Sequence, residues 1–411
     1  MILIVSPRLP LPWSVWIRRT ALFGAWVTLF LVLAEFGLRW IVPAPMRVPT
    51  LFDCEGSEIY GWAFPPNSPL PIANPDTGEI ETVDRTNSRG WKDVEHSFSN
   101  ETNAFRILVV GDSMTQGIVK MEDVYHRVLE RLLKAEGYRA EVIALGVGGW
   151  STDQEFQAYL HEGRKYRPHV IVSQFTHNDL DGLAGKDGLF DESLKPFAFK
   201  LVNGSLEIER RERRFPEPSA WERLDRFSLL HSRLYLFGRS LYFKHVAPLV
   251  LKRDIRNRFL AALESQDAGF QFVGEETEEQ KATWDLYEAI LARWRELAEN
   301  DRSRLVMFTE CCGESELQFG LRWICKRENG KILKKTDKGW IEIDVEKPRR
   351  RLEAICDELG IDLVPNSRFY ERFEYDPHPT VAGNRAMAED LRDFLLGHPV
   401  ISQQLESYRN P

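Results

Sequence analysis

The sequence predicts an α/β fold built around a parallel sheet, and two observations carry this prediction. Short runs of apolar, often β-branched residues recur along the chain, at residues 106–110, 141–145, 170–175, 304–309 and 361–364. Such runs are typical of strands that are buried on both faces, as in a parallel sheet. Most of these runs are separated by helical patterns, and an alternation of strand and helix implies right-handed crossovers between parallel strands.

The helices between these strands are indicated by apolar residues at three- and four-residue spacing. The first lies near residues 122–136, where Gly137 can end it in the left-handed conformation. Ser151 and Gln154 form a capping box at the start of the second. Three further helices are predicted at residues 284–297, 348–359 and 381–396.

Composition excludes some classes of protein. The 411 residues are 43% hydrophobic and 28% charged, which fits a globular core in one large domain with insertions, or in two domains. The net charge is -8 and there is no basic domain, so we expect no nucleic-acid partner. We also expect no metal or other cofactor, because there is no His-Glu-x-x-His motif and the nine histidines are scattered.

An apolar stretch near the amino terminus predicts a transmembrane anchor. Residues 20–34 carry no charge, and the stretch continues to residue 42 with only Glu35 and Arg39 interrupting it. Three arginines precede it and acidic residues follow, so the positive-inside rule puts residues 1–19 in the cytoplasm. The alternative is a cleaved signal peptide that ends at Ala34. Either way, the body of the chain is expected outside the cytoplasm, in the periplasm or at the cell surface.

We favour a retained anchor at residues 20–42, since Trp26, Trp40 and Arg39 suit a membrane interface. Residues 43–104 are rich in Pro and Asn, and are expected to form an extended segment with little regular structure that packs on the body. The α/β domain then covers residues 105–397. A tail follows at residues 398–411.

The α/β rhythm breaks twice inside this domain. Residues 182–281 form a first insertion, with a hairpin at Asn203-Gly204 and a helix over residues 227–243, which would suit a lid or a wall of a substrate site. Residues 313–342 form a second, polar insertion. The five cysteines allow one disulfide, between Cys325 and either Cys311 or Cys312, and the others are expected to be small buried side chains.

Polar residues follow four of the predicted strands. Ser113 follows the first strand, Gly149 the second and Asn178 the third, while Asp376 and His378 follow the fifth. Carboxyl ends of parallel strands meet at one edge of a sheet. Acyl transfer needs a nucleophile, a base, an orienting carboxylate and donors for an oxyanion, and this set supplies each. Taken alone, the turn at Ser113 also fits a capping serine, and Asp376 also fits a turn-forming residue before Pro.

In these positions the sequence resembles the SGNH, or GDSL, hydrolase family. The resemblance covers residues 106–397 apart from the insertions, and departs from the family pattern in two places. Thr176 stands where the family usually has Gly, and Asp376 and His378 are two residues apart instead of three. The four motifs are Gly111-Asp112-Ser113, Gly146-Val147-Gly148-Gly149-Trp150, Thr176-His177-Asn178-Asp179 and Asp376-Pro377-His378.

The resemblance implies a flavodoxin-like three-layer α/β/α sandwich with a five-stranded parallel sheet. It also implies a serine ester hydrolase that forms an acyl-enzyme on Ser113, with His378 as base and Asp376 orienting it. The oxyanion hole would consist of the backbone N–H groups of Ser113 and Gly149 and the side-chain amide of Asn178.

The expected substrate is an acyl or acetyl ester, of a small molecule or a polysaccharide, because an enzyme outside the membrane meets exported carbohydrate. Two related functions stay open, an O-acyltransferase with the same acyl-enzyme and a lipid esterase. A third alternative is a non-catalytic protein that binds or assembles polysaccharide.

Overall fold

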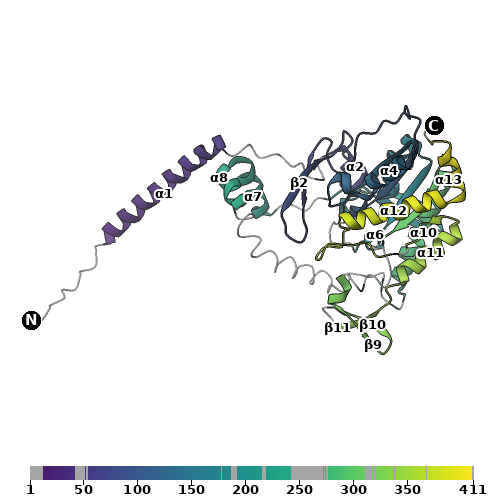
Figure 1. Cartoon of the computed structure of the whole chain (residues 1–411). Helices are drawn as coiled ribbons and strands as arrows, with labels where there is room; N and C mark the ends of the chain where they lie inside the picture. Colours follow the sequence, from purple (N-terminus) through teal and green to yellow (C-terminus); the bar gives the residue numbers. More distant parts are fainter. Residues whose placement is uncertain are drawn as a thin grey trace, which may run out of the picture. The chain divides into compact units, whose positions relative to one another are not determined.

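The computed structural model describes residues 13–41, 51, 54–176, 178–186, 192–214, 219–241, 272, 274, 276–310, 317, 320–336, 339–366 and 368–409. The chain divides into two compact units (Figure 1). The smaller comprises Met1–Arg47 with Pro216–Leu249, and the larger comprises Val48–Phe215 with Val250–Pro411.

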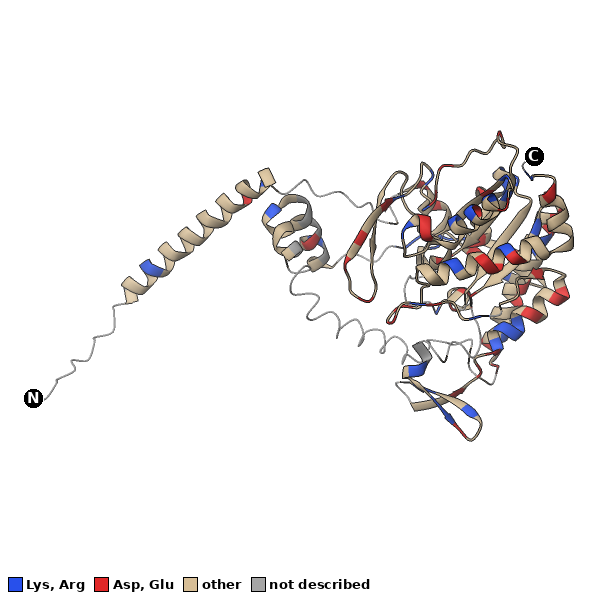
Figure 2. Ribbon diagram, in the orientation of Figure 1, with Lys and Arg blue, Asp and Glu red and all other residues tan. Residues whose placement is uncertain are grey.

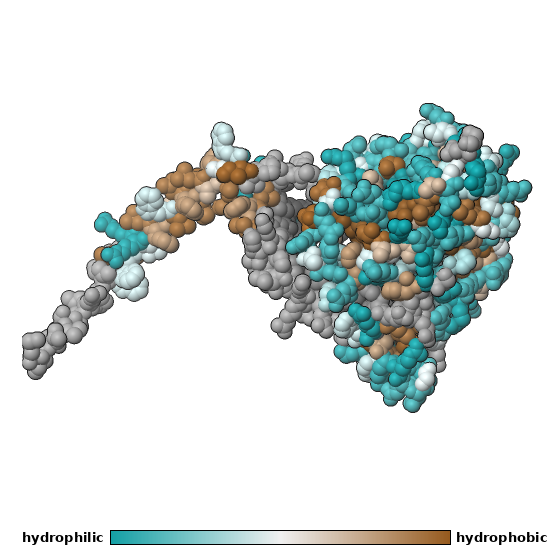
Figure 3. Space-filling model, in the orientation of Figure 1, coloured by the Kyte–Doolittle hydropathy of each residue, from teal (hydrophilic) through white to brown (hydrophobic). Residues whose placement is uncertain are grey.

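The smaller unit contains the long helix α1 (Trp13–Ile41) and two short helices. Within α1, Val15–Ile41 is long and apolar enough to cross a membrane, and its side chains are exposed. Few charged residues lie along α1 (Figure 2), and hydrophobic side chains cover most of it (Figure 3). In place of the single helix predicted over residues 227–243, the chain forms α7 (Ala220–His231) and α8 (Arg233–Leu241). They separate at Ser232, because its hydroxyl accepts a hydrogen bond from Tyr235 N (3.0 Å) and starts a new helix.

The larger unit is organised around a five-stranded parallel sheet, as predicted. Its order is β12-β8-β5-β3-β4, which in order of appearance along the chain is the 2-1-3-4-5 order of flavodoxin-like folds. Almost every residue of the four longer strands is buried, which explains their continuous apolar runs. The strands are β3 (Phe105–Gly111), β4 (Ala140–Gly146), β5 (Val170–Phe175), β8 (Arg304–Thr309) and β12 (Asp362–Leu363).

Helices cover both faces of this sheet, which gives the expected three layers. Alternate residues of β3 enter different cores: Leu108 and Val110 pack on one side, Ile107 and Val109 on the other. The first core is closed by α5 (Thr152–His161), α10 (Glu278–Asn300) and α11 (Lys347–Leu359). The second is closed by α4 (Tyr125–Ala135), α12 (Val381–Gly397) and α13 (Pro399–Glu406).

The segment before the sheet has more regular structure than the sequence predicts. It contains α2 (Glu55–Tyr60) and an antiparallel hairpin of β1 (Pro69–Ala73) and β2 (Ile80–Arg85). Asn74 forms the turn, since its side-chain oxygen accepts hydrogen bonds from Asp76 N (2.9 Å) and Thr77 N (3.2 Å). The expectation of little regular structure is therefore wrong for this hairpin, because side-chain capping of the turn was not recognised.

Both insertions contain small antiparallel sheets. The hairpin predicted at Asn203-Gly204 is present as β6 (Phe197–Val202) and β7 (Ser205–Arg210). The second insertion forms β9 (Cys325–Glu328), β10 (Lys331–Thr336) and β11 (Gly339–Ile343). Short helical segments complete the described part: α3 (Ser113–Gln116), α6 (Asn178–Leu183), η1 (Met121–Asp123), η2 (Gly163–Tyr166), η3 (Glu192–Leu194) and η7 (Gly320–Trp323).

The disulfide expected for Cys325 is not formed. Cys54, Cys325 and Cys356 carry free thiols, while Cys311 and Cys312 lie outside the described residues. Cys325 packs instead against a small apolar cluster that includes Ile324 and Ile343, where it acts as a small hydrophobic side chain.

Candidate active site

The turn after β3 presents Ser113 at the carboxyl edge of the sheet. Asp112 caps the one-turn helix α3, and its Oδ1 accepts a hydrogen bond from Met114 N (2.8 Å). Ser113 is the first residue of that turn and is half-buried. The turn packs tightly on the strand end, because a Cβ at Gly111 would lie 2.2 Å from Thr115 Oγ1. Only glycine fits at this position, which accounts for the first residue of the motif.

The loop after β4 lies beside Ser113. A Cβ at Gly148 would be 3.6 Å from the Cβ of Ser113, and Gly148 N donates a hydrogen bond to Gln116 Oε1 (2.7 Å). Gly149 has a φ of 75°, a left-handed conformation that favours glycine. The loop that carries this candidate oxyanion donor is therefore attached to the same helical turn as the candidate nucleophile.

Two tryptophan side chains support this loop through hydrogen bonds. Trp62 Nε1 donates to the carbonyl of Gly148 (3.0 Å), and Trp150 Nε1 donates to the carbonyl of Trp62 (3.0 Å). Both rings are fully buried. Trp62, in the segment before the sheet, thus holds the Gly148–Gly149 backbone in place.

Asn178 begins α6 after β5, and its side chain reaches the Ser113 turn. Asn178 Nδ2 donates a hydrogen bond to Asp112 Oδ2 (3.0 Å). A side-chain amide carries two N–H donors, so the second can serve an oxyanion. The preceding Thr176 is buried, and its hydroxyl accepts a hydrogen bond from Gln174 (2.6 Å), so it belongs to the packed strand end. His177 lies outside the described residues.

Asp376 and His378 lie on the loop after β12. Asp376 Oδ1 accepts hydrogen bonds from both the backbone N–H (2.9 Å) and the Nδ1 of His378. The turn between them makes this contact possible although the residues are only two apart. Nε2 of His378 is buried and has no hydrogen-bond partner among the described residues. Asp376 therefore orients the ring through Nδ1, and Nε2 is available to accept the proton of a nucleophile.

The loop that carries this pair is closed at its base. Arg372 and Pro379 form an antiparallel bridge, and Phe373 N donates to the carbonyl of His378 (3.2 Å). Asp76, at the tip of the β1–β2 hairpin, accepts hydrogen bonds from Glu374 N (3.0 Å) and Tyr375 N (2.9 Å). Sequence reasoning missed Asp76. The turn pattern Asn74-Pro75-Asp76-Thr77-Gly78 could have revealed the hairpin, but no local signal indicates its partner.

Electrostatics couple His378 to the Ser113 turn. Burial lowers the pKa of His378, but the hydrogen bond and charge of Asp376, with the charge of Asp112, more than offset this and raise it. Burial raises the pKa of Asp112, against the hydrogen bonds that it accepts and the charge of His378. The charges of His378 and of the carboxyl group that precedes Ser113 therefore influence each other.

Further buried acids lie near the site, and sequence reasoning did not identify them as a group. Both carboxyl oxygens of Glu155 on α5 lack a hydrogen-bond partner among the described residues. Burial, followed by the charges of Asp179 and Asp112, raises the pKa of Glu155 well above its usual range. Asp179 is buried and its pKa is raised in the same way. No local signal identifies them, because polar residues in the first turns of a helix are usually exposed, whereas those of α5 are buried.

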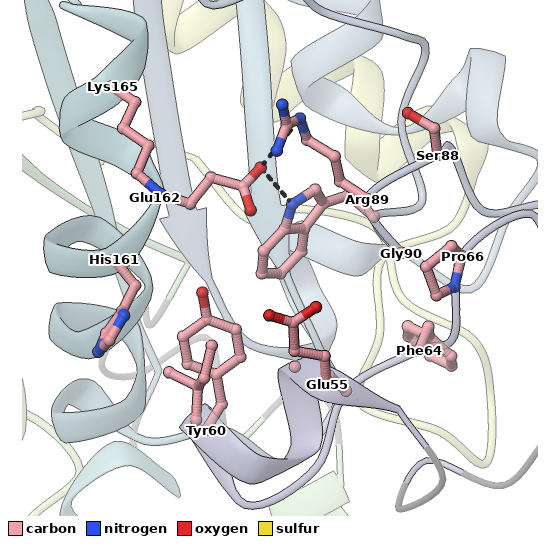
Figure 4. A pocket seen from close by; sticks show the side chains of 14 residues that line it. Glu55, Tyr60, Phe64, Pro66, Ser88, Arg89, Gly90, His161, Glu162 and Lys165 are labelled. Atoms are coloured by element: carbon pink, nitrogen blue, oxygen red, sulfur yellow. Dashed lines mark hydrogen bonds and ion pairs between the residues drawn. The ribbon is translucent and has the colours of Figure 1, made fainter.

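A cavity of about 380 Å³ lies between α2, the segment around Trp91 and the end of α5 (Figure 4). Oε1 of Glu162 accepts hydrogen bonds from Trp91 Nε1 (2.9 Å) and the hydroxyl of Tyr166 (2.8 Å). The Trp91 ring also contacts Trp150, with 5.8 Å between the ring centroids. Neither Ser113 nor His378 lines this cavity, so it is distinct from the candidate catalytic groups. Among the described residues, no group of three or more His, Cys, Asp or Glu side chains could hold a metal ion.

Comparison with solved structures finds matches at low sequence identity and low TM-score. TesA matches with a TM-score of 0.34 and 12% identity, over 71% of this chain and 97% of TesA. An acetyl xylan esterase matches with a TM-score of 0.33 and 14% identity, over 70% and 97%. A GDSL-like lipase from Bacteroides thetaiotaomicron matches with a TM-score of 0.31 and 11% identity, over 76% and 92%.

No protein-family model matches the chain, and no curated protein matches it either. The assignment therefore depends on its own features, namely the 2-1-3-4-5 sheet order and the four motifs at the carboxyl edge. In these features the chain resembles the SGNH, or GDSL, hydrolases, a class of serine ester hydrolases.

Proposed function

We propose that this protein is a membrane-anchored, extracytoplasmic serine hydrolase that cleaves acyl or acetyl esters of a carbohydrate. The observation that carries the proposal is the state of His378. Its Nδ1 is hydrogen-bonded to Asp376, and its Nε2 is buried without a partner among the described residues.

The reaction follows from these positions. Ser113 Oγ attacks the ester carbonyl while its proton moves to Nε2 of His378. The negative charge on the tetrahedral oxygen is stabilised by the backbone N–H groups of Ser113 and Gly149 and by the amide of Asn178. Collapse expels the alcohol, which takes the proton from His378 and leaves an acyl group on Ser113. Water, deprotonated by His378, then attacks the acyl carbonyl. The bond to Ser113 Oγ breaks, the acid leaves, and His378 returns the proton to Ser113.

The cellular location and the substrate are supported by the amino terminus. Helix α1 is long and apolar enough to span a bilayer, with Arg18 and Arg19 near its start and acidic residues beyond its end. This asymmetry favours a cytoplasmic amino terminus and an exported α/β domain. Cell-wall and exported polysaccharides, which often carry acyl esters, are then the substrates within reach.

The experiment uses the full chain in detergent, with p-nitrophenyl acetate, butyrate and octanoate as substrates and a fluorophosphonate probe. We expect turnover and labelling in the wild type, and loss of both in Ser113→Ala. Ser407→Ala, which changes an exposed serine of the tail, is the matched control and should retain both. Release of acetate from acetylated xylan tests the carbohydrate substrate, with the deacetylated polymer as blank.

Each result bears on a different part of the proposal. Labelling of Ser113 with little hydrolysis would contradict the hydrolase and indicate acyl transfer to another alcohol. A strong preference for octanoate, with no acetate released from xylan, would contradict the carbohydrate substrate. A folded protein with neither labelling nor turnover would contradict catalysis altogether.

A further inference from the structure

Two charged residues of α1 hold the turn between α7 and α8. Glu35 accepts hydrogen bonds from Ser232 Oγ (2.9 Å), Arg233 N (2.9 Å) and Leu234 N (2.8 Å), which are the first donors of α8. A carboxylate at this position caps the helix and interacts favourably with its dipole. Glu35 thereby satisfies donors that would otherwise need water.

Arg39 completes this contact one turn further along α1. It donates to the carbonyl of His231 at the end of α7 (3.4 Å) and forms an ion pair with Glu35 (3.2 Å). The two charges that interrupt the apolar stretch are thus paired with each other and with the ends of two short helices. Charged residues in an apolar span are costly unless paired in this way, so their presence indicates a structural role.

The position of the turn along α1 can be estimated. The 29 residues of α1 correspond to about 43 Å, whereas the hydrocarbon core of a bilayer is about 30 Å thick. Starting after Arg19, about 20 residues cross that core and reach Arg39. The α7–α8 turn, held by Glu35 and Arg39, therefore lies at the end of the span that follows the membrane crossing.

Helix α7 presents a face of exposed apolar side chains. Trp221, Leu224 and Phe227 recur every three residues and are 76%, 50% and 61% exposed. Arg223 and Asp225 flank this face. On α8, Tyr235, Phe237 and Leu241 are also exposed. Large apolar side chains in such number are unusual on a water-facing surface, and aromatic residues at the end of a span suit the bilayer interface.

We propose that α7 and α8 form a helical hairpin that lies in the interfacial layer of the bilayer, with its apolar face toward lipid, attached to the anchor through Glu35 and Arg39. The proposal depends on the membrane anchor of the proposed function. Lipid is the occupant that the observations favour. The Glu35–Arg39 contact joins the α7–α8 hairpin to α1, and the apolar surface of α1 is itself exposed.

Two consequences follow. On this proposal, residues 219–241 of the first insertion are a membrane element. The anchor must also be retained, because cleavage after Ala34 would remove the helix that positions Glu35.

The test uses the full chain in vesicles of phosphatidylcholine and phosphatidylglycerol, with benzoylphenylalanine placed at single positions. Light-induced adducts to lipid are measured by mass spectrometry. We expect adducts from Phe30 in α1 and from Phe227 in α7, and several-fold fewer from Arg223 on the flank of α7. Adducts from Phe30 without adducts from Phe227 would overturn the interfacial hairpin alone. Absence of adducts from Phe30 would overturn the anchor, and the hairpin with it.

A second set of variants tests the role of Glu35. Glu35→Ala should lower the yield of lipid adducts at Phe227 several-fold, while the yield at Phe30 stays unchanged. Thr28→Ala is the matched control, because the Thr28 hydroxyl bonds only within α1, to the carbonyl of Gly24. Fluorophosphonate labelling of Ser113 reports that the larger unit remains folded. An unchanged yield at Phe227 in Glu35→Ala would refute the proposed attachment.

Discussion

Asp76 and Tyr375 are 299 residues apart, yet Asp76 Oδ1 accepts a hydrogen bond of 2.9 Å from the backbone N–H of Tyr375. The other oxygen of Asp76 accepts from Glu374 N. The next residue is Asp376, which orients His378. The hairpin before the sheet therefore fixes the backbone on which the candidate base is carried.

Loss of this contact should slow catalysis without weakening substrate binding. Asp76→Ala removes two charge-assisted hydrogen bonds, each of about 1.5–3 kcal/mol, while the bridge at the base of the loop remains. We expect kcat to fall about tenfold with KM little changed, and Asp76→Asn, which keeps one acceptor oxygen, to be intermediate. Glu79→Ala, on the same turn but without a contact to the loop, is the control. Equal losses of kcat in Asp76→Ala and Glu79→Ala would mean that the hairpin affects catalysis only through the stability of the fold.

Asn178 should contribute as an oxyanion donor. Removing one such donor typically costs about 10²- to 10³-fold in kcat, and we expect a loss of this size in Asn178→Ala with p-nitrophenyl acetate. Because Asn178 also binds Asp112, circular dichroism spectra and thermal unfolding should be compared with those of the wild type. A kcat within about twofold of the wild type would exclude the amide from the oxyanion hole.

The pH profile should report the environment of His378. The neutral imidazole is the active base, and the pKa of His378 is raised, so activity should rise with pH through a midpoint above the usual 6.5. Asp376→Asn removes the hydrogen-bonded carboxylate, so the midpoint should move to lower pH. We expect kcat to fall about 10²- to 10⁴-fold in the same variant. An unchanged midpoint in Asp376→Asn would mean that Asp376 does not interact with the catalytic base.

Glu155 should make the fold less stable as pH rises. A carboxyl group whose pKa is raised in the folded state contributes fully below its unfolded value near 4.5, and that contribution is lost as pH rises through the folded value. Glu155→Gln removes this titration, so its midpoint of thermal unfolding relative to the wild type should be higher at pH 9 than at pH 5. Glu79→Gln, at an exposed position, is the control substitution. If the unfolding midpoints of Glu155→Gln and the wild type differ by the same amount at pH 5 and pH 9, the protonation of Glu155 does not change on unfolding.

The sheet and the candidate site could be predicted because their signals are local. Residues 107–110 and 170–172 are apolar throughout, since these strands are buried on both faces, and a polar motif follows each strand. Gly111 is a local signal as well, because the turn at Ser113 leaves no space for a Cβ.

The features that were missed depend on contacts between distant residues. Glu35 was interpreted as a charge that interrupts the apolar stretch, whereas its partners lie almost 200 residues further along the chain. The hydrogen-bond partners of Asp76, Glu374 and Tyr375, are likewise 298 and 299 residues further along the chain. Glu155 was missed for a different reason, since a polar residue near a helix start is usually exposed, and its burial follows from packing against the sheet edge.

The most direct test of the account is to trap the acyl-enzyme. The full chain is mixed with p-nitrophenyl acetate, quenched in acid during turnover and analysed by mass spectrometry of the intact protein and its peptides. The account predicts one added acetyl group, located on Ser113, that is absent from Ser113→Ala. Turnover with no adduct on Ser113, or an adduct on another residue that persists in Ser113→Ala, would contradict it.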